Sequence, residues 1–260
     1  KQTMKKILGL MLLTLTLTAS AQDKNKGKDK TPKAPKPAKV VEPKVEKTKP
    51  DYSKLDLSKR ASDHLMLQFG VTNWSKPSNI TIKGFNRSFN GYFLFDFPFK
   101  SNPRYSVAVG PGIGSDNMYL DKMSVDLNNR NGVQFTRDTI TRYKKNKFAT
   151  SYFEAPLELR YSTKPENMNS GWKLALGVKI GTLLDSKVKS KVDLDATGTG
   201  GYYAKEKDKR FLNATRVAFT ARAGLGNFSF YGSYQVSAVF KEGLGPVIRP
   251  WTIGVTLSGL

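Results

Sequence analysis

Residues 152–161 have the sequence YFEAPLELRY, in which apolar or aromatic side chains occupy the odd-numbered positions. The even-numbered positions include Glu154, Glu158 and Arg160. This alternation predicts a β-strand with one apolar and one polar face, because successive side chains of a strand point to opposite sides. The stretch exceeds the usual soluble strand of about 5–6 residues and matches the ~9–11 residues of a membrane-crossing strand.

The same alternation recurs along the rest of the chain. It predicts strands over residues 65–71, 92–99, 105–114, 152–161, 172–182, 216–225, 228–240 and 251–258. Small residues recur on the polar face, namely Gly110, Gly112, Gly114, Gly177, Gly181, Gly224 and Gly254. Glycines suit the crowded inside of a narrow barrel better than the exposed face of a soluble sandwich or lipocalin-like carrier, which is the alternative. We therefore predict an all-β fold, an eight-stranded antiparallel up-and-down transmembrane β-barrel, over residues 61–260.

The connections between these strands alternate in length. The long connections cover about residues 75–87, 121–147, 185–211 and 241–248. The short connections cover about residues 100–104, 162–171 and 226–227. Outer-membrane barrels have long outer loops and short periplasmic turns, so both ends of the predicted barrel are expected in the periplasm.

The N-terminal region has two parts that precede the barrel. Residues 4–21, MKKILGLMLLTLTLTASA, combine two lysines, an apolar stretch and an A-x-A cleavage site. This pattern predicts a signal peptide over residues 1–21, with residues 1–3 as an upstream extension. The alternative, a membrane anchor, would need about 20 spanning residues. Residues 22–60 are rich in Lys and Pro and predict a disordered N-terminal extension, a periplasmic tail.

Composition excludes several kinds of site. The 260 residues contain no Cys and one His, His64, which excludes disulfides, thiolate metal sites and a multi-His metal centre. The chain has 43 Lys and Arg against 21 Asp and Glu, a net charge of +22. The excess is divided among the signal peptide, the tail and the loops, so we predict no nucleic-acid partner. We also predict no cofactor and no metal.

The polar face of the strands predicts a charged interior. Its charged members, three acids and five bases, are Asp96, Glu154, Glu158, Arg160, Lys173, Lys179, Arg216 and Arg222. Eight strands leave an interior only wide enough for side chains, where unpaired charges are costly. We therefore expect these charges to pair and close the interior; the alternative is a gated ion path.

The long connections predict a basic outer surface. The candidate lipopolysaccharide contacts are Arg142, Lys144, Lys145, Lys147, Lys187, Lys189 and Lys191. Lys and Arg neutralise phosphate groups well, so outer-membrane lipid and lipopolysaccharide are the expected partners. The cell wall, or a periplasmic or secretion-complex protein, is a candidate partner of the tail over residues 22–60.

An enzyme is the less favoured interpretation. No G-x-S-x-G motif is present. His64, which a lipid A hydrolase or acyltransferase would need near the outer face, falls at the periplasmic start of the first predicted strand. We therefore predict a protein that is not an enzyme.

Four segments resemble a known family. Residues 152–161, 176–181, 224–228 and 251–255 are similar to strands of PorT-like outer membrane β-barrel proteins of Bacteroidota. The resemblance implies a small eight-stranded barrel, and one namesake supports a type IX protein secretion system. The expected function is therefore a non-enzymatic structural or assembly component linked to protein secretion, with a periplasmic tether. The alternative is a surface adhesin or a barrel that binds glycolipid or lipopolysaccharide through basic outer loops.

Overall fold

The computed structural model describes residues 60, 64–75, 77, 79–139, 143–167, 170–192 and 201–259. The predicted signal peptide and residues 22–59 of the predicted tail lie outside this part of the chain. The described residues contain no helix that is long and apolar enough to cross a membrane.

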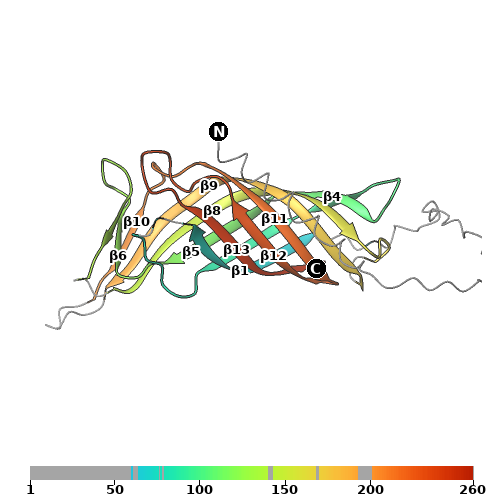
Figure 1. The fold of residues 1–260 in the computed structure, drawn as a ribbon, viewed down its shortest axis with the longest axis horizontal. Coiled ribbons are helices and arrows are strands. Elements are labelled where there is room, and N and C mark those ends of the chain that lie inside the picture. Colours follow the sequence, from blue (N-terminus) through green and yellow to red (C-terminus); the bar gives the residue numbers. More distant parts are fainter. Residues whose placement is uncertain are drawn as a thin grey trace, which may run out of the picture. The chain divides into compact units, whose positions relative to one another are not determined.

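The described chain is built from strands (Figure 1). They are β1 (Leu65–Ser75), β2 (Arg87–Phe93), β3 (Phe95–Pro98), β4 (Tyr105–Val109), β5 (Gly112–Tyr119), β6 (Met123–Asp126), β7 (Gln134–Arg137), β8 (Tyr143–Ser162), β9 (Trp172–Val192), β10 (Tyr203–Lys207), β11 (Thr215–Leu225), β12 (Phe228–Gln235) and β13 (Arg249–Ser258).

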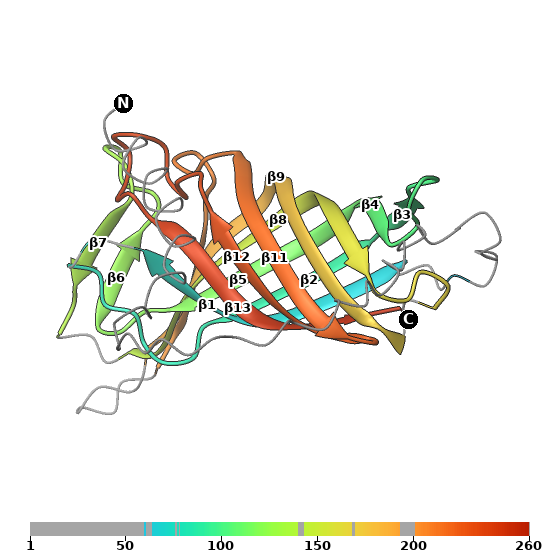
Figure 2. The same ribbon diagram turned by 45° about the vertical axis from the view of Figure 1, so that its right-hand side comes forward.

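Antiparallel pairing closes these strands into a barrel. The order is β8-β9-β11-β12-β13-β1-β2-β5, and β5 pairs with β8 to complete the circle. Strand β3 continues β2, and β4 precedes β5 along β8, so each of these pairs forms one barrel strand. Figure 2 shows the tilted strands wrapping around one axis. The predicted eight-stranded antiparallel barrel is confirmed.

Two predicted strands are interrupted at the same place. The predicted strand 105–114 breaks at Gly110 and Pro111, and the strand 92–99 breaks at Leu94. Pro111 has no N–H to donate, but its carbonyl accepts the Phe93 N–H at 2.8 Å. A side chain at Gly110 would collide with the Phe93 carbonyl, so the irregularity needs glycine there.

Strands β8 and β9 are longer than predicted. They have 20 and 21 residues, and their pairing continues to Tyr143 and Val192. The prediction ended these strands at the apolar residues, but the backbone pairing continues through the lysine-rich stretches that follow. Lys144, Lys145 and Lys147 are therefore on β8, and the three lysines at 187, 189 and 191 are on β9, not in loops as predicted.

The two ends of the barrel differ. Four long connections (76–86, 120–142, 193–214 and 236–248) lie at one end, here called the long-loop end. The connections 99–104, 163–171 and 226–227 lie at the other, the short-turn end. Inside the long-loop end, Trp74, Phe148 and Phe240 belong to a buried apolar cluster that also includes Met123 and Leu127 from the long connection after β5. The predicted alternation of loop lengths is confirmed.

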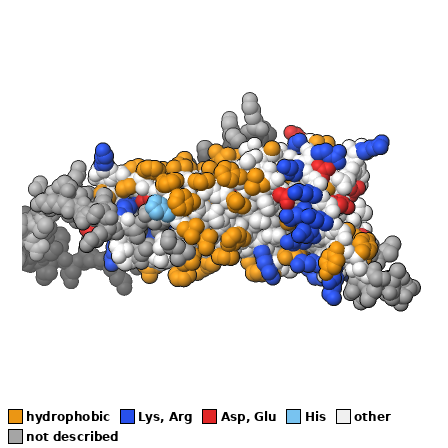
Figure 3. All heavy atoms as spheres, turned by 180° about the vertical axis from the view of Figure 1, so that it is seen from behind, with side chains coloured by type: hydrophobic (Ala, Val, Ile, Leu, Met, Phe, Trp, Pro, Cys, Tyr) orange, Lys and Arg blue, Asp and Glu red, His pale blue; other side chains and the backbone are white. Residues whose placement is uncertain are grey.

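The barrel wall is apolar on the outside. Phe228 and Phe230 are 70% and 75% exposed, so their faces cannot belong to a packed core. Exposed members of this band are Phe69, Phe89, Ile113, Phe153, Leu157, Leu159, Leu174, Leu176, Ile180, Phe219, Phe228, Phe230, Ile253 and Val255. Figure 3 shows hydrophobic side chains gathered across the middle of the visible face. A continuous apolar band of this kind is typical of barrels that face lipid.

Closure of the barrel depends on a close backbone approach, which generates a prediction. Gly70 and Gly254 face each other across β1 and β13. A side chain at Gly254 would collide with the Phe69 carbonyl, which is backbone and cannot move aside. We expect Gly254→Ala to lower the free energy of unfolding by about 1–3 kcal/mol. Urea titration in detergent, followed by the different gel migration of folded and unfolded barrel, measures this change.

Gly232→Ala is the matched control on neighbouring β12. Nothing lies within 4 Å of a Cβ built at Gly232. We expect it to change stability by no more than about 0.5 kcal/mol. Equal destabilisation by the two variants would contradict the close-approach explanation.

Candidate functional site

One group of charges lies inside the barrel toward the short-turn end. Glu158 of β8 accepts hydrogen bonds from Arg160 and Arg222, each at 2.9 Å. Arg160 also lies 3.6 Å from Asp96 of β3. The second partner of Asp96 is Arg60, at 2.6 Å, whose guanidinium also donates to a backbone carbonyl. These side chains are almost completely buried.

A second group lies farther toward the long-loop end. Glu154 of β8 pairs with Arg216 of β11 at 2.9 Å and with Lys179 of β9 at 3.3 Å. The Tyr92 hydroxyl donates to Glu154 at 2.6 Å. Arg216 also pairs with Asp116 of β5 at 2.9 Å.

Two glycines leave room for the Glu154 side chain. A Cβ at Gly114 would lie 2.9 Å from the Glu154 carboxylate, and one at Gly181 would lie 2.9 Å from its Cγ. Both glycines come from the set that the sequence placed on the inner face. Glycine is therefore needed at both positions, because the Glu154 side chain occupies the space that a side chain there would take.

The interior thus contains all eight residues predicted for it. Asp96, Glu154, Glu158, Arg160, Lys179, Arg216 and Arg222 take part in the two groups, and Lys173 is buried on the inner face of β9. Asp116, Tyr92 and Arg60 also belong to these groups but were not predicted. Continuing the alternation two residues past Gly114 would have placed Asp116 inside, whereas Arg60 was assigned to the tail.

A second arrangement of charges lies on the outer face of the wall. Lys147 of β8 is directly opposite Lys189 of β9, which is opposite Lys205 of β10. Lys191 is likewise opposite Lys145. Directly opposite residues share a face of a sheet, so these lysines form rows across three strands. We call this set the lysine ladder; its members are Lys145, Lys147, Lys187, Lys189, Lys191, Lys205 and Lys207.

The lysine ladder is short of carboxylates. Asp185 pairs with Lys187 at 2.8 Å and with Lys207 at 3.1 Å, and hydrogen bonds from these lysines lower the pKa of Asp185. No carboxylate of the described residues forms an ion pair with the other five lysines of the ladder. Partial burial lowers the pKa of Lys147, and Lys145, Lys189 and Lys187 lower it further by repulsion. Lys147 donates its hydrogen bond to a neutral group, the Asn117 amide oxygen, at 2.8 Å.

The ladder begins where the apolar band ends. Along the outer face of β8, exposed Phe153 is followed by Ser151 and Ala149 and then by Lys147. Figure 3 shows Lys and Arg side chains gathered toward one end of the visible face, beside the hydrophobic side chains. Lys144, predicted with the ladder residues, is exposed on β8, and Arg142 lies outside the described residues.

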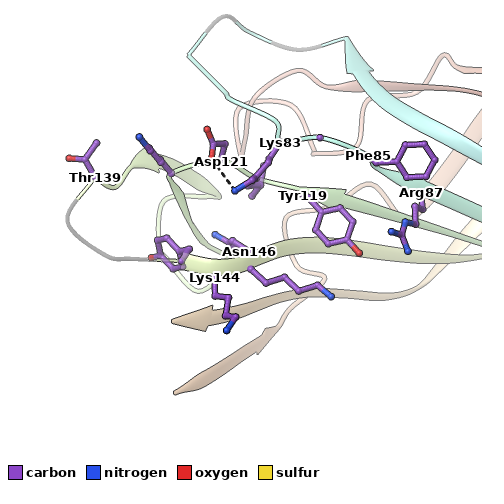
Figure 4. A pocket seen from close by; sticks show the side chains of 13 residues that line it. Lys83, Phe85, Arg87, Tyr119, Asp121, Thr139, Lys144 and Asn146 are labelled. Atoms are coloured by element: carbon purple, nitrogen blue, oxygen red, sulfur yellow. Dashed lines mark ion pairs between the residues drawn. The ribbon is translucent and has the colours of Figure 1, made fainter. Parts of the chain in front are cut away.

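Beside the ladder is a cleft of about 650 Å³, shown in Figure 4. We call it the outer cleft. Its walls come from the connection between β1 and β2, from the end of β5 and from the start of β8. They include Phe85, Arg87, Tyr119, Lys144 and Lys145. Figure 4 shows Lys83 and Asp121 close together at one side, where they form a 4.0 Å ion pair.

His64 lies at the opposite end of the barrel from the lysine ladder and the outer cleft. It precedes β1 at the short-turn end, where its Nδ1 is 3.0 Å from the Leu94 carbonyl oxygen. Its ring stacks on Phe93 with centroids 5.5 Å apart. These contacts give the residue a packing role.

The interior charges generate a prediction about stability. Glu154→Gln leaves Lys179 and Arg216 buried with less negative charge beside them. Breaking a buried ion pair from one side costs about 3–5 kcal/mol, which is the expected loss in the free energy of unfolding. Urea titration in detergent measures it. Glu242→Gln, at an exposed loop position, is the control, and an equally small effect of both changes would argue against the pairing.

The chain was compared with known proteins. Two structures of Ail, the attachment invasion locus protein of Yersinia pestis, are similar to the chain, and each match covers 75% of this chain and 95% of Ail. The structure with the heparin analogue sucrose octasulfate is 11% identical, with a TM-score of 0.34. The other is 13% identical, with a TM-score of 0.33. No curated protein is similar to the chain in sequence.

A family model gives the stronger result. The outer membrane protein beta-barrel domain matches residues 59–249, which is most of the chain. This match indicates the outer membrane as the location. In barrels of this membrane the longer loops are on the outer side. The chain therefore belongs to the outer membrane protein beta-barrel family.

Proposed function

We propose that this barrel is not an enzyme and that its lysine ladder binds phosphate groups of lipopolysaccharide in the outer leaflet. The observation that carries the proposal is the position of the ladder, directly beyond the apolar band on the outer half of the wall. Of the two expectations from sequence, this one corresponds to glycolipid binding. The binding residues are on strands instead of loops.

The physical argument starts from repulsion within the ladder. Like charges directly opposite each other on a sheet destabilise it. Lys147, Lys189 and Lys205 form such a row, without a carboxylate of the described residues to offset it. An anion placed between the rows removes this cost and adds charge-assisted hydrogen bonds. Lipid phosphates at the membrane surface supply anions at this height.

The paired interior supports a role on the outer surface. Glu154 and Glu158 each form ion pairs with two cations, and the apolar cluster with Trp74 and Phe240 lies inside the outer end. Such packing favours a structural interior over an ion path. His64 is at the end opposite the ladder, which supports a binding role over lipid A chemistry.

The structural or assembly role, linked to protein secretion and with a periplasmic tether, stays a prediction, as does the finer assignment to PorT-like barrels. One contact favours the tether. Arg60, at the end of the predicted tail, is held by Asp96 inside the short-turn end. This contact fixes the last residue of the predicted tail at the end that the proposal assigns to the periplasm.

Charge removal tests the ladder. We expect Lys189→Gln with Lys205→Gln to weaken binding of purified barrel to lipopolysaccharide by about 2 kcal/mol, roughly 30-fold, because each lysine near an anionic surface contributes about 1 kcal/mol. The measurement is binding to immobilised lipopolysaccharide over a salt series. Lys164→Gln with Lys241→Gln removes the same charge at exposed positions outside the ladder. Equal weakening by both pairs of substitutions would show that binding depends on net charge and not on the lysine ladder.

The lowered pKa of Lys147 predicts a pH dependence. A bound anion favours the charged amine, so affinity is greatest below this pKa and falls as pH rises through it. We expect that fall at a pH below the usual lysine pKa of about 10.4. Phosphate titrates near pH 6, so the lipid charge is constant there. Lys147→Arg keeps its charge and should shift the fall to higher pH; an unshifted profile would exclude Lys147 as its source.

A further inference from the structure

We propose that the outer cleft binds a sugar that carries a phosphate or sulfate group. The proposal rests on the proposed function only for the position of the barrel relative to the outer leaflet. Its residues, apart from Lys145, are not members of the lysine ladder. The volume of about 650 Å³ is within the ~300–1,000 Å³ of small-molecule sites.

The charge of the cleft selects an anion. Five of its lining residues are cations and one, Asp121, is a carboxylate, which gives a net charge of +4. Asp121 is already paired with Lys83. Arg87 and Lys144 line the same cleft, and their side chains belong to different segments. An anion in the cleft gains charge-assisted hydrogen bonds from its lining cations.

The aromatic rings of the cleft select a ligand with a flat apolar face. Phe85 is 62% exposed, and it follows Gly84, whose positive φ of 57° turns the chain. The Arg87 guanidinium lies 5.6 Å from the Phe85 ring centroid, and Lys145 Nζ lies 5.5 Å from that of Tyr119. Each ring therefore has a cation beside it. A pyranose stacks its C–H face on such a ring and presents an anionic substituent to the cation, whereas inorganic phosphate would leave the ring unused.

The height of the cleft identifies the source of that sugar. Arg87 comes two residues before Phe89 of the apolar band, on the same outer face of β2. The cleft therefore opens where the sugar headgroups of outer-leaflet glycolipids lie. We assign it to a phosphorylated headgroup of this kind; a free sulfated or phosphorylated glycan shares the chemistry.

The test uses the barrel in phosphatidylethanolamine nanodiscs without glycolipid. The probes, titrated by calorimetry, are a glucosamine disaccharide bisphosphate, a sulfated disaccharide and an uncharged disaccharide. We expect saturable binding of the two anionic sugars, weakened about tenfold or more for the uncharged one. Phe85→Ala and Arg87→Gln should each weaken the anionic sugars about fivefold or more.

Matched variants separate the cleft from the ladder. Tyr203 also has a lysine, Lys191, over its ring at 4.8 Å, but it is outside the cleft. Tyr203→Ala, and Lys189→Gln with Lys205→Gln, should leave disaccharide affinity within about twofold. Unchanged affinity in the cleft variants, equal loss in the ladder variant, or equal binding of the uncharged sugar would each overturn the proposal. Lipopolysaccharide binding by the ladder is measured separately, so the two proposals fail independently.

A second arm identifies the source. Lipid A embedded in the nanodisc should compete with the free bisphosphate, and Phe85→Ala should weaken that competition. Undiminished binding of the free sugar in the presence of lipid A would overturn the headgroup assignment.

Discussion

Pairing of buried charges inside a narrow barrel is the constraint on which the rest of the structure depends. The apolar band takes one face of every strand, so the other face points into an interior with room for side chains alone. There, Arg216 lies between Asp116 and Glu154 from two other strands. The arrangement requires the correct register of β5, β8 and β11, and it requires Gly114 and Gly181 to leave space. The strand register that closes the wall therefore also pairs the interior charges.

The fold could be predicted because strand alternation is a local property. Phe153 to Tyr161 alternate whatever their neighbours are, and the same holds for the other strands. Strand length could not be predicted in this way. Beyond Phe153 the outer face of β8 becomes polar, which looks like a loop in sequence, yet pairing with β9 continues to Tyr143. Backbone hydrogen bonds between β8 and β9 sustain the extra length of both strands. The presence of such a long partner strand is not a local property of the sequence.

The interior residues could be predicted, but their partners could not. Glu158 and Arg222 are inside because of their place in the alternation. Which strand brings a cation to Glu158 depends on register, which alternation leaves open. The outer cleft is harder still, because Phe85, Tyr119 and Lys144 come from three segments that only the closed barrel brings together.

The same lysines have a consequence for how copies of the barrel meet. Beyond the apolar band, the sheet ends at β10, which is an edge strand among the described residues. An uncovered edge offers backbone groups to any other strand, including that of a second barrel. Lys205 and Lys207 on β10 are exposed beside this edge, so two copies that approach edge to edge bring like charges together. Repulsion between these lysines therefore disfavours the joining of neighbouring barrels into a continuous sheet.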